Sequence, residues 1–208
     1  MNARDAPTPA LILRCACGTL GGTLGDAQDQ RSTRIVCYCA DCRAFARWLD
    51  ADAPPHDADG GSDILQVSPA RLAFSEGIDR LACFRLSPRG LLRWYASCCR
   101  TPVCNTVDAR QLPFAGVSTR FVHTPDVTTL EGLIGAVRHG VQAGREHGIE
   151  APWPVHAGVP FALIAGSIRN IGGWRLRGDH RRSPLSDPDT GEPAVAPEVL
   201  SAAERATL

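Results

Sequence analysis

The stretch from residue 81 to residue 99 reads LACFRLSPRGLLRWYASCC, and it decides the fold class of the chain. Two apolar-rich runs, Leu81–Leu86 and Leu91–Ala96, flank a four-residue segment that contains both proline and glycine. Runs of this length around such a turn are typical of a β-hairpin. The turn length predicts that Phe84 lies opposite Arg93. The second strand leads directly to two adjacent cysteines, Cys98 and Cys99.

Two further strand-like runs, Ile64–Val67 and Arg71–Phe74, precede this hairpin. We expect all four runs to form an antiparallel meander with cysteine-bearing loops at its ends. Glycines between residues 18 and 25 are suited to tight turns and a short N-terminal hairpin. The sequence therefore predicts a mainly β fold with added α structure: a zinc-stapled antiparallel β domain followed by a helical C-terminal extension.

Nine cysteines occur in the chain, and an odd number without a secretory-type opening segment argues against a disulfide framework. We therefore expect a cytoplasmic protein with free thiols. Cys83 lies in the middle of an apolar run, where a small buried hydrophobe is the simplest interpretation. Seven cysteines instead form close groups in sequence: Cys15, Cys17, Cys37, Cys39, Cys42, Cys98 and Cys99.

These groups have the spacing of metal ligands, and zinc is the default soft ion for thiolates. Cys15, Cys17, Cys98 and Cys99 supply the four thiolates of a closed structural site, with Cys104 as the alternative to Cys98. The triplet of Cys37, Cys39 and Cys42 supplies only three, which leaves one position open. We predict two zinc ions. A redox Cys-x-x-Cys motif is the alternative for the triplet, but its βαβ setting is not evident.

The charge of an open three-thiolate zinc indicates the kind of ligand it binds. A Zn²⁺ ion with three thiolates carries a formal charge of −1, which makes it a weak activator of water. A soft substrate thiolate suits the fourth position better. Arg34, Arg43 or Arg47 is predicted to offset the accumulated negative charge.

Helical patterns lie on both sides of the predicted meander. We expect a helix over residues 42–49 capped by Asp41, an amphipathic helix from Val127 to Val141, and a buried or docking helix over residues 157–168. The last of these is too short to cross a bilayer. The predicted units are a zinc-binding domain at 11–120, a helical extension at 121–178 and a proline-rich tail at 179–208.

The composition excludes some classes of partner. The 208 residues are 44% hydrophobic and 21% charged, which argues against a disordered chain and against a membrane bundle. Twenty-two basic residues balance 22 acidic ones, so no overall field attracts nucleic acid. A local arginine patch formed by Arg175, Arg177, Arg181 and Arg182 is the one segment that could act on nucleic acid.

Three cysteine-bearing segments form a recognisable set: Cys15-Ala16-Cys17-Gly18, Cys37-Tyr38-Cys39-Ala40-Asp41-Cys42-Arg43 and Arg93-Trp94-Tyr95-Ala96-Ser97-Cys98-Cys99-Arg100-Thr101-Pro102. Together they resemble the glutathione-dependent formaldehyde-activating enzyme and centromere protein V family. The resemblance implies a zinc-binding β-tent fold, an open middle triplet and a carbon–sulfur lyase type of activity that joins formaldehyde to glutathione. This chain departs from the family at Tyr38, where histidine is usual, and at residues 96–100, where Cys-x-x-Cys-Gly is usual.

Two functions of different classes follow from these patterns. The first is an enzyme that acts on small thiol adducts, with Cys37, Cys39, Cys42 and Arg43 at its catalytic site. The second is a non-catalytic module in which zinc only staples the fold and the helical extension binds a partner protein.

Overall fold

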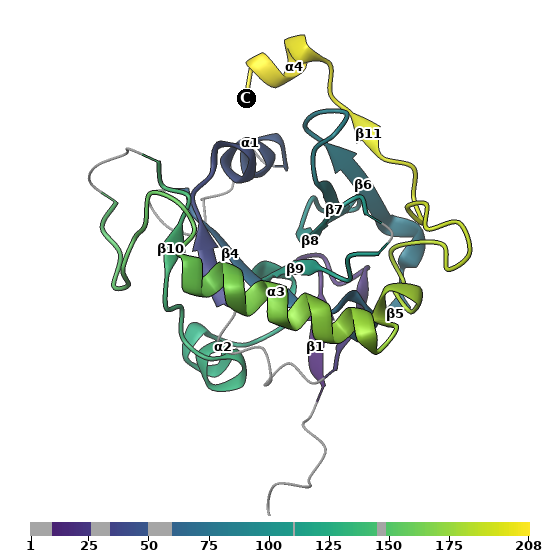
Figure 1. Cartoon of the computed structure of the whole chain (residues 1–208). Coiled ribbons are helices and arrows are strands. Elements are labelled where there is room, and N and C mark those ends of the chain that lie inside the picture. Colours follow the sequence, from purple (N-terminus) through teal and green to yellow (C-terminus); the bar gives the residue numbers. More distant parts are fainter. Residues whose placement is uncertain (1–9, 26–33, 50–59, 110, 145–148) are drawn as a thin grey trace, which may run out of the picture.

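The computed structural model describes residues 10–25, 34–49, 60–109, 111–144 and 149–208. In these ranges the strands form two sheets, and helices pack around them (Figure 1). One sheet has the order β1 (Leu11–Arg14), β2 (Gly21–Leu24), β5 (Leu72–Glu76). The other has the order β10 (Gly140–Val141), β3 (Arg34–Cys37), β4 (Ser62–Val67), β9 (Ala115–Ser118), β8 (Pro102–Thr106), β7 (Leu92–Ala96), β6 (Leu81–Arg85), β11 (Glu198–Val199). The predicted class, mainly β with α, is confirmed.

The predicted hairpin forms from β6 and β7, and Phe84 lies opposite Arg93 as expected. Antiparallel pairing continues from β7 through β8 and β9 to β4. The two outermost strands, β10 and β11, pair in parallel with their neighbours. Apolar side chains between the two sheets form the main core, which includes Leu13, Leu65 and Trp94.

The predicted meander of four runs is wrong for its first two. The run at residues 64–67 forms β4, which lies in the large sheet but pairs with β3 and β9, and the run at residues 71–74 lies in the other sheet. After β4 the chain leaves the large sheet through the 3₁₀ turn η2 (Pro69–Arg71), and β5 then pairs with β2. The approach of these strands is very close at Gly22, where an added Cβ would lie 2.1 Å from the carbonyl oxygen of Ala73. Only glycine permits this contact.

The helix predicted over residues 42–49 begins earlier than expected, because α1 runs over Ala40–Leu49. Asp41 therefore lies in the first turn of the helix and not at its cap. Its carboxylate accepts a hydrogen bond of 2.7 Å from Arg205 Nη2, near the C-terminus of the chain. The buried face of α1 packs Phe45 and Leu49 against Phe84 of β6.

The amphipathic helix predicted from Val127 to Val141 is wrong in its second half. α2 covers Val127–Ile134 and ends at Gly135, whose φ is 84°. Glycine adopts this conformation at little cost, so the chain can leave the helix there. Val141 lies instead in β10, which adds to the edge of β3. Tertiary pairing thus replaces the last turns of a glycine-rich helical pattern.

The third predicted helix is displaced toward the C-terminus, since α3 runs over Phe161–Leu176. Most of this helix is not buried. Trp174 is buried, whereas the side chain of Phe161 is 83% exposed, that of Ile168 66% and that of Leu176 90%. Figure 1 shows α3 lying across one face of the large sheet. No helix among the described residues is long and apolar enough to cross a membrane.

The predicted tail over residues 179–208 wraps around the body of the protein. β11 pairs with β6, and Leu185 and Leu200 are buried. A short helix, α4 (Ala202–Ala206), follows with a capping box formed by Ser201 and Glu204. Two arginines of the patch considered for nucleic acid, Arg177 and Arg182, form ion pairs with the buried Asp179.

Candidate metal centres

Four cysteines from two distant loops meet at one end of the core. Cys15 and Cys17 follow β1, whereas Cys98 and Cys99 lie in the turn between β7 and β8. Their sulfur atoms all lie within 4.8 Å of one another. The Sγ of Cys17 is 3.5 Å from that of Cys15 and 3.4 Å from that of Cys98. This four-cysteine cluster therefore joins the two sheets through their loops.

The spacing of these sulfurs fits a tetrahedral metal ion. Zinc–sulfur bonds of about 2.3 Å place tetrahedral sulfurs roughly 3.8 Å apart. Cys15 and Cys98 are 3.8 Å apart, and Cys98 and Cys99 are 3.9 Å apart. Cys104, the predicted alternative, is buried in the main core with Cys83. The structure thus brings Cys98, and not Cys104, to the cluster.

The backbone at Arg100 explains how two adjacent cysteines can share one cluster. Arg100 has a φ of 58°, in the left-handed region that favours glycine. The turn at residues 97–99 and this conformation bend the chain so that both thiols face the same point. The Arg100 guanidinium lies 4.9 Å from the ring centroid of Trp48, a cation–π contact that holds it in place.

Hydrogen bonds support thiolate character in the four-cysteine cluster. The backbone N–H of Leu20 donates to the Sγ of Cys15 at 3.2 Å. The Thr19 hydroxyl lies 3.2 Å from the Sγ of Cys17. Hydrogen bonds with the side chain and backbone of Thr19, and with Cys98, lower the pKa of that thiol to about 6. Thr101 Oγ1 lies 3.1 Å from the Sγ of Cys99. Groups that stabilise thiolates also favour metal binding, because the metal binds the deprotonated form.

The second cluster contains Cys37, Cys39 and Cys42, whose sulfurs also lie within 4.8 Å of one another. Cys37 ends β3, Cys39 occupies the connection, and Cys42 lies in the first turn of α1. The Cys42 N–H donates to the carbonyl of Cys39 at 3.0 Å and lies 3.4 Å from its Sγ. A short strand-to-helix connection therefore assembles the three-cysteine cluster, which can hold a metal ion.

A buried arginine that the sequence did not single out contacts this cluster. Arg93 of β7 is only 2% exposed, and its Nη1 lies 3.9 Å from the Sγ of Cys42 and 3.3 Å from Asn105 Oδ1. Its guanidinium also lies 5.2 Å from the Phe45 ring centroid. The sequence feature that could have pointed to Arg93 is a charged residue in the middle of an otherwise apolar strand.

Two of the three arginines predicted to offset the charge, Arg34 and Arg47, have other surroundings. Arg34 donates to Asp63 with Nη2 at 2.6 Å and to the carbonyl of Gly135 at 2.7 Å. Arg47 is exposed on α1. Arg43 lies over the Tyr38 ring at 5.9 Å, so the catalytic role assigned to it stays a prediction.

Thiol pKa values in the three-cysteine cluster diverge strongly. Hydrogen bonds from Cys37 and Cys42 lower the pKa of Cys39 to about 2, and the charge of Arg93 adds to the effect. The hydrogen bond to Cys39 correspondingly raises the pKa of Cys37. These contacts favour deprotonation at Cys39 over Cys37. Metal binding must displace the protons that remain on the cluster.

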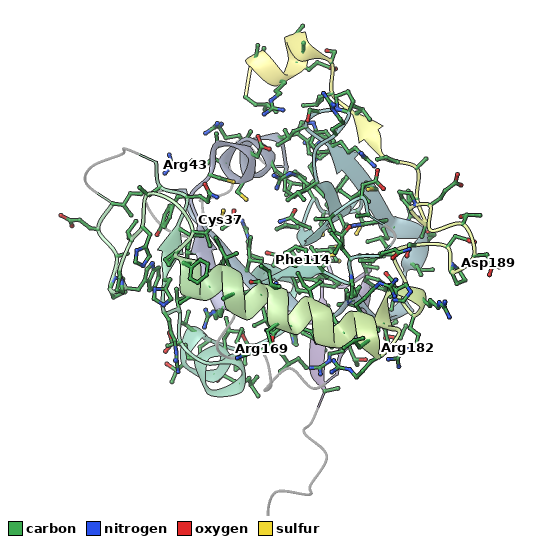
Figure 2. All side chains as sticks on the ribbon, viewed as in Figure 1. Cys37, Arg43, Phe114, Arg169, Arg182 and Asp189 are labelled. Atoms are coloured by element: carbon green, nitrogen blue, oxygen red, sulfur yellow. The ribbon has the colours of Figure 1, made fainter. Side chains whose placement is uncertain are left out.

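A large pocket opens from the three-cysteine cluster and extends beneath α3. Its volume is about 1050 Å³, at the upper end of ligand sites. All three cysteines and Arg93 line it at one end, while strands of the large sheet and α3 form its walls. Figure 2 shows Cys37 and Phe114 around this opening, above α3. The four-cysteine cluster lies outside this pocket.

Comparisons with known proteins place this arrangement in a family. A family model described as a family of unknown function (DUF6151) matches residues 8–197, which include both cysteine clusters and α3. A crystal structure of a Rhodobacter sphaeroides protein is similar, with 16% identity and a TM-score of 0.43. That match covers 61% of this chain and 97% of the other. No curated protein matches the sequence.

Proposed function

Since the chain belongs to the family of unknown function DUF6151, we propose its function from the two cysteine clusters. The protein binds two zinc ions, one enclosed by the four-cysteine cluster and one held by the three-cysteine cluster. The single observation that carries this proposal is the convergence of seven cysteines into sets of four and three. The set of three, which lacks a fourth thiolate, lines the pocket of about 1050 Å³ beneath α3, whereas Cys15 and Cys17 of the set of four line a smaller pocket of about 380 Å³.

The open site suits a small thiol as its substrate. When bound there, zinc supplies a soft Lewis acid with a free coordination position. Three thiolates leave that site with a formal charge of −1, and a fourth thiolate adds another negative charge. Arg93 is buried 3.9 Å from Cys42 Sγ and contributes the compensating positive charge. A soft anionic ligand is therefore favoured over an activated water.

The reaction class comes from the resemblance of residues 15–18, 37–43 and 93–102 to glutathione-dependent formaldehyde-activating enzymes. We propose a carbon–sulfur lyase type of reaction on thiol adducts of aldehydes. In the direction of synthesis, the thiolate sulfur donates an electron pair to the aldehyde carbon. The electron pair of the carbonyl π bond moves to oxygen, which then takes a proton. With glutathione and formaldehyde this yields S-hydroxymethylglutathione.

Metal analysis and a spectroscopic titration test this function. Protein purified without chelator should contain about two zinc ions per chain. In the cobalt-substituted protein, a low-molecular-weight thiol should change the thiolate-to-metal and ligand-field bands of one site only. The Cys39→Ser variant should keep one ion and lose the response to thiol. One ion or none in the unsubstituted protein would contradict the proposal.

A non-catalytic interaction module is the second candidate. It is favoured by apolar side chains on the outer surface of α3, where Phe161 is 83% exposed and Leu176 90% exposed. In this function both zinc ions only staple the fold, and α3 contacts a partner protein. Two bound ions together with a cobalt spectrum that no thiol alters would favour this module over the enzyme.

A further inference from the structure

We infer that the pocket beneath α3 selects thiols with a bulky apolar group, such as a long alkyl chain, over hydrophilic thiols such as glutathione. This inference rests on the proposed function, because it requires the three-cysteine cluster to hold the sulfur. It adds a substrate class, which follows from the walls of the pocket and not from the cysteines.

The walls of the pocket are mainly aliphatic and aromatic. The large sheet contributes Ile35 and Ile64, and Phe114 lies beside it. The opposite wall is formed by Ala162 and Leu163 of α3. An apolar chain that starts at the cysteines would therefore run between a sheet face and a helix face. Burial of such a chain is favourable in proportion to the apolar area removed from water.

Several polar groups of the pocket already have partners within the protein. Gln66 accepts a hydrogen bond of 3.0 Å from Ser167, which ties α3 to β4. Arg93 donates to Asn105 at 3.3 Å. Asp41 at the rim forms an ion pair with Arg205. At these groups a thiol that carries two carboxylates and an ammonium group would have to compete with existing contacts, whereas an alkyl chain leaves them intact. Polar side chains of Gln142, Arg169 and Asn170 also line the pocket, so the selection rests on its aliphatic and aromatic walls.

Unfilled space beneath α3 is evident at one glycine. Gly166 lines the pocket, and a Cβ added there would meet no atom within 4 Å. Gly172, further along the same helix, is equally open but does not line the pocket. The two glycines therefore form a matched pair, since a leucine fits at either position and only one of them narrows the pocket.

A chain-length series tests the inference on the zinc-loaded full chain. Binding of ethanethiol, butanethiol, hexanethiol and octanethiol is measured by calorimetry, with glutathione alongside. The affinity should rise about fourfold for each added methylene that enters the pocket. Octanethiol should bind at least a hundredfold more tightly than glutathione. An affinity that does not increase with chain length would overturn the inference.

Leucine variants link the effect to the pocket. Gly166→Leu should lower the ratio of octanethiol to ethanethiol affinity at least tenfold, whereas Gly172→Leu should leave that ratio unchanged. An equal effect of both variants would overturn the inference.

A sulfur-free ligand separates this inference from the proposed function. If ethanethiol alters the cobalt spectrum and octanethiol binds no more tightly, the apolar selectivity is wrong and the thiol site stands. If no thiol alters the spectrum but 1-octanol binds and Gly166→Leu abolishes that binding, the thiol function is wrong and the apolar pocket stands.

Discussion

Arg93 is the residue on which the charge of the three-cysteine cluster depends. It lies in the middle of β7, and its Nη1 reaches within 3.9 Å of Cys42 Sγ. Asn105 of β8 and the ring of Phe45 of α1 hold the guanidinium in position. A buried cation at this distance stabilises thiolates because the surroundings screen the charges poorly.

We predict that Arg93→Met raises the thiol pKa values of this cluster, since the stabilising positive charge is lost. Fewer thiolates are then present at a given pH, so metal binding needs a higher pH. The midpoint of cobalt uptake at the three-cysteine cluster should move upward by about one pH unit. A pH titration of the cobalt bands measures this shift. Arg93→Lys, which keeps the charge, is the control and should stay closer to the unsubstituted protein.

Arg100 provides a second prediction at the residue scale, because its φ of 58° is costly for any residue with a Cβ. Arg100→Gly and Arg100→Ala both lose the cation–π contact with Trp48. The two variants differ in backbone strain, which glycine relieves. Arg100→Gly should therefore exceed Arg100→Ala in unfolding free energy by about 1 kcal/mol. Denaturant unfolding of the zinc-loaded variants measures the difference, and equal values would contradict it.

At the scale of elements, one buried ion pair ties three segments together. Arg34 at the start of β3 donates to Asp63 of β4 through Nε at 3.0 Å and Nη2 at 2.6 Å. The same guanidinium donates to the carbonyl of Gly135, where α2 ends. The pair therefore fixes the register of β3, the strand that delivers Cys37 to its cluster.

Removal of one partner of this pair should be costly. Asp63→Ala leaves the guanidinium of Arg34, which is 3% exposed, without its carboxylate. The expected loss of unfolding free energy is about 3–5 kcal/mol. Asp79→Ala removes an exposed carboxylate that pairs with Arg80 and should change stability by about 0.5 kcal/mol or less. Similar losses in the two variants would show that the buried pair is not structurally important.

At the scale of the whole molecule, the four-cysteine cluster joins loops of the two sheets, which also share the main core. The β1–β2 loop belongs to the small sheet, and the β7–β8 turn belongs to the large one. Structural zinc contributes an apparent ~10–16 kcal/mol in small domains, which compares with a net stability of about 5–15 kcal/mol. Zinc at this cluster would therefore account for most of the stability of the fold.

Loss of that zinc should abolish cooperative unfolding. Cys17→Ser removes one of four ligands, and we expect one metal ion fewer per chain and no cooperative thermal transition. Cys83→Ala is the control, because Cys83 is buried in the core and belongs to neither cluster. It should keep both ions and a cooperative transition, with a loss of about 1 kcal/mol. Calorimetry and metal analysis of both variants measure the outcome, and cooperative melting of Cys17→Ser would reject the structural role.

The sequence alone was sufficient to predict the features that short-range chemistry controls. The pairing of Phe84 with Arg93 followed from the length of one turn. The division of seven cysteines into sets of four and three followed from their spacing and from the number of ligands that zinc prefers. The presence of α1 followed from apolar residues spaced on one helix face and that of α3 from a continuous apolar stretch, although the bounds of both differ from the prediction.

Only the tertiary structure decided which segments meet over long distances. β5 pairs with β2 because Gly22 permits a close approach of the two strands. Nothing in the sequence of residues 71–74 indicates that β2 is their partner. Residues 135–141 do not continue the predicted helix. The edge of β3 supplies backbone hydrogen bonds to β10, and a sequence pattern of neighbouring residues cannot reveal such a distant partner. Arg93 faces the cysteines because β7 crosses beside α1. The pocket exists because α3, which begins almost 70 residues after Arg93, closes over the sheet.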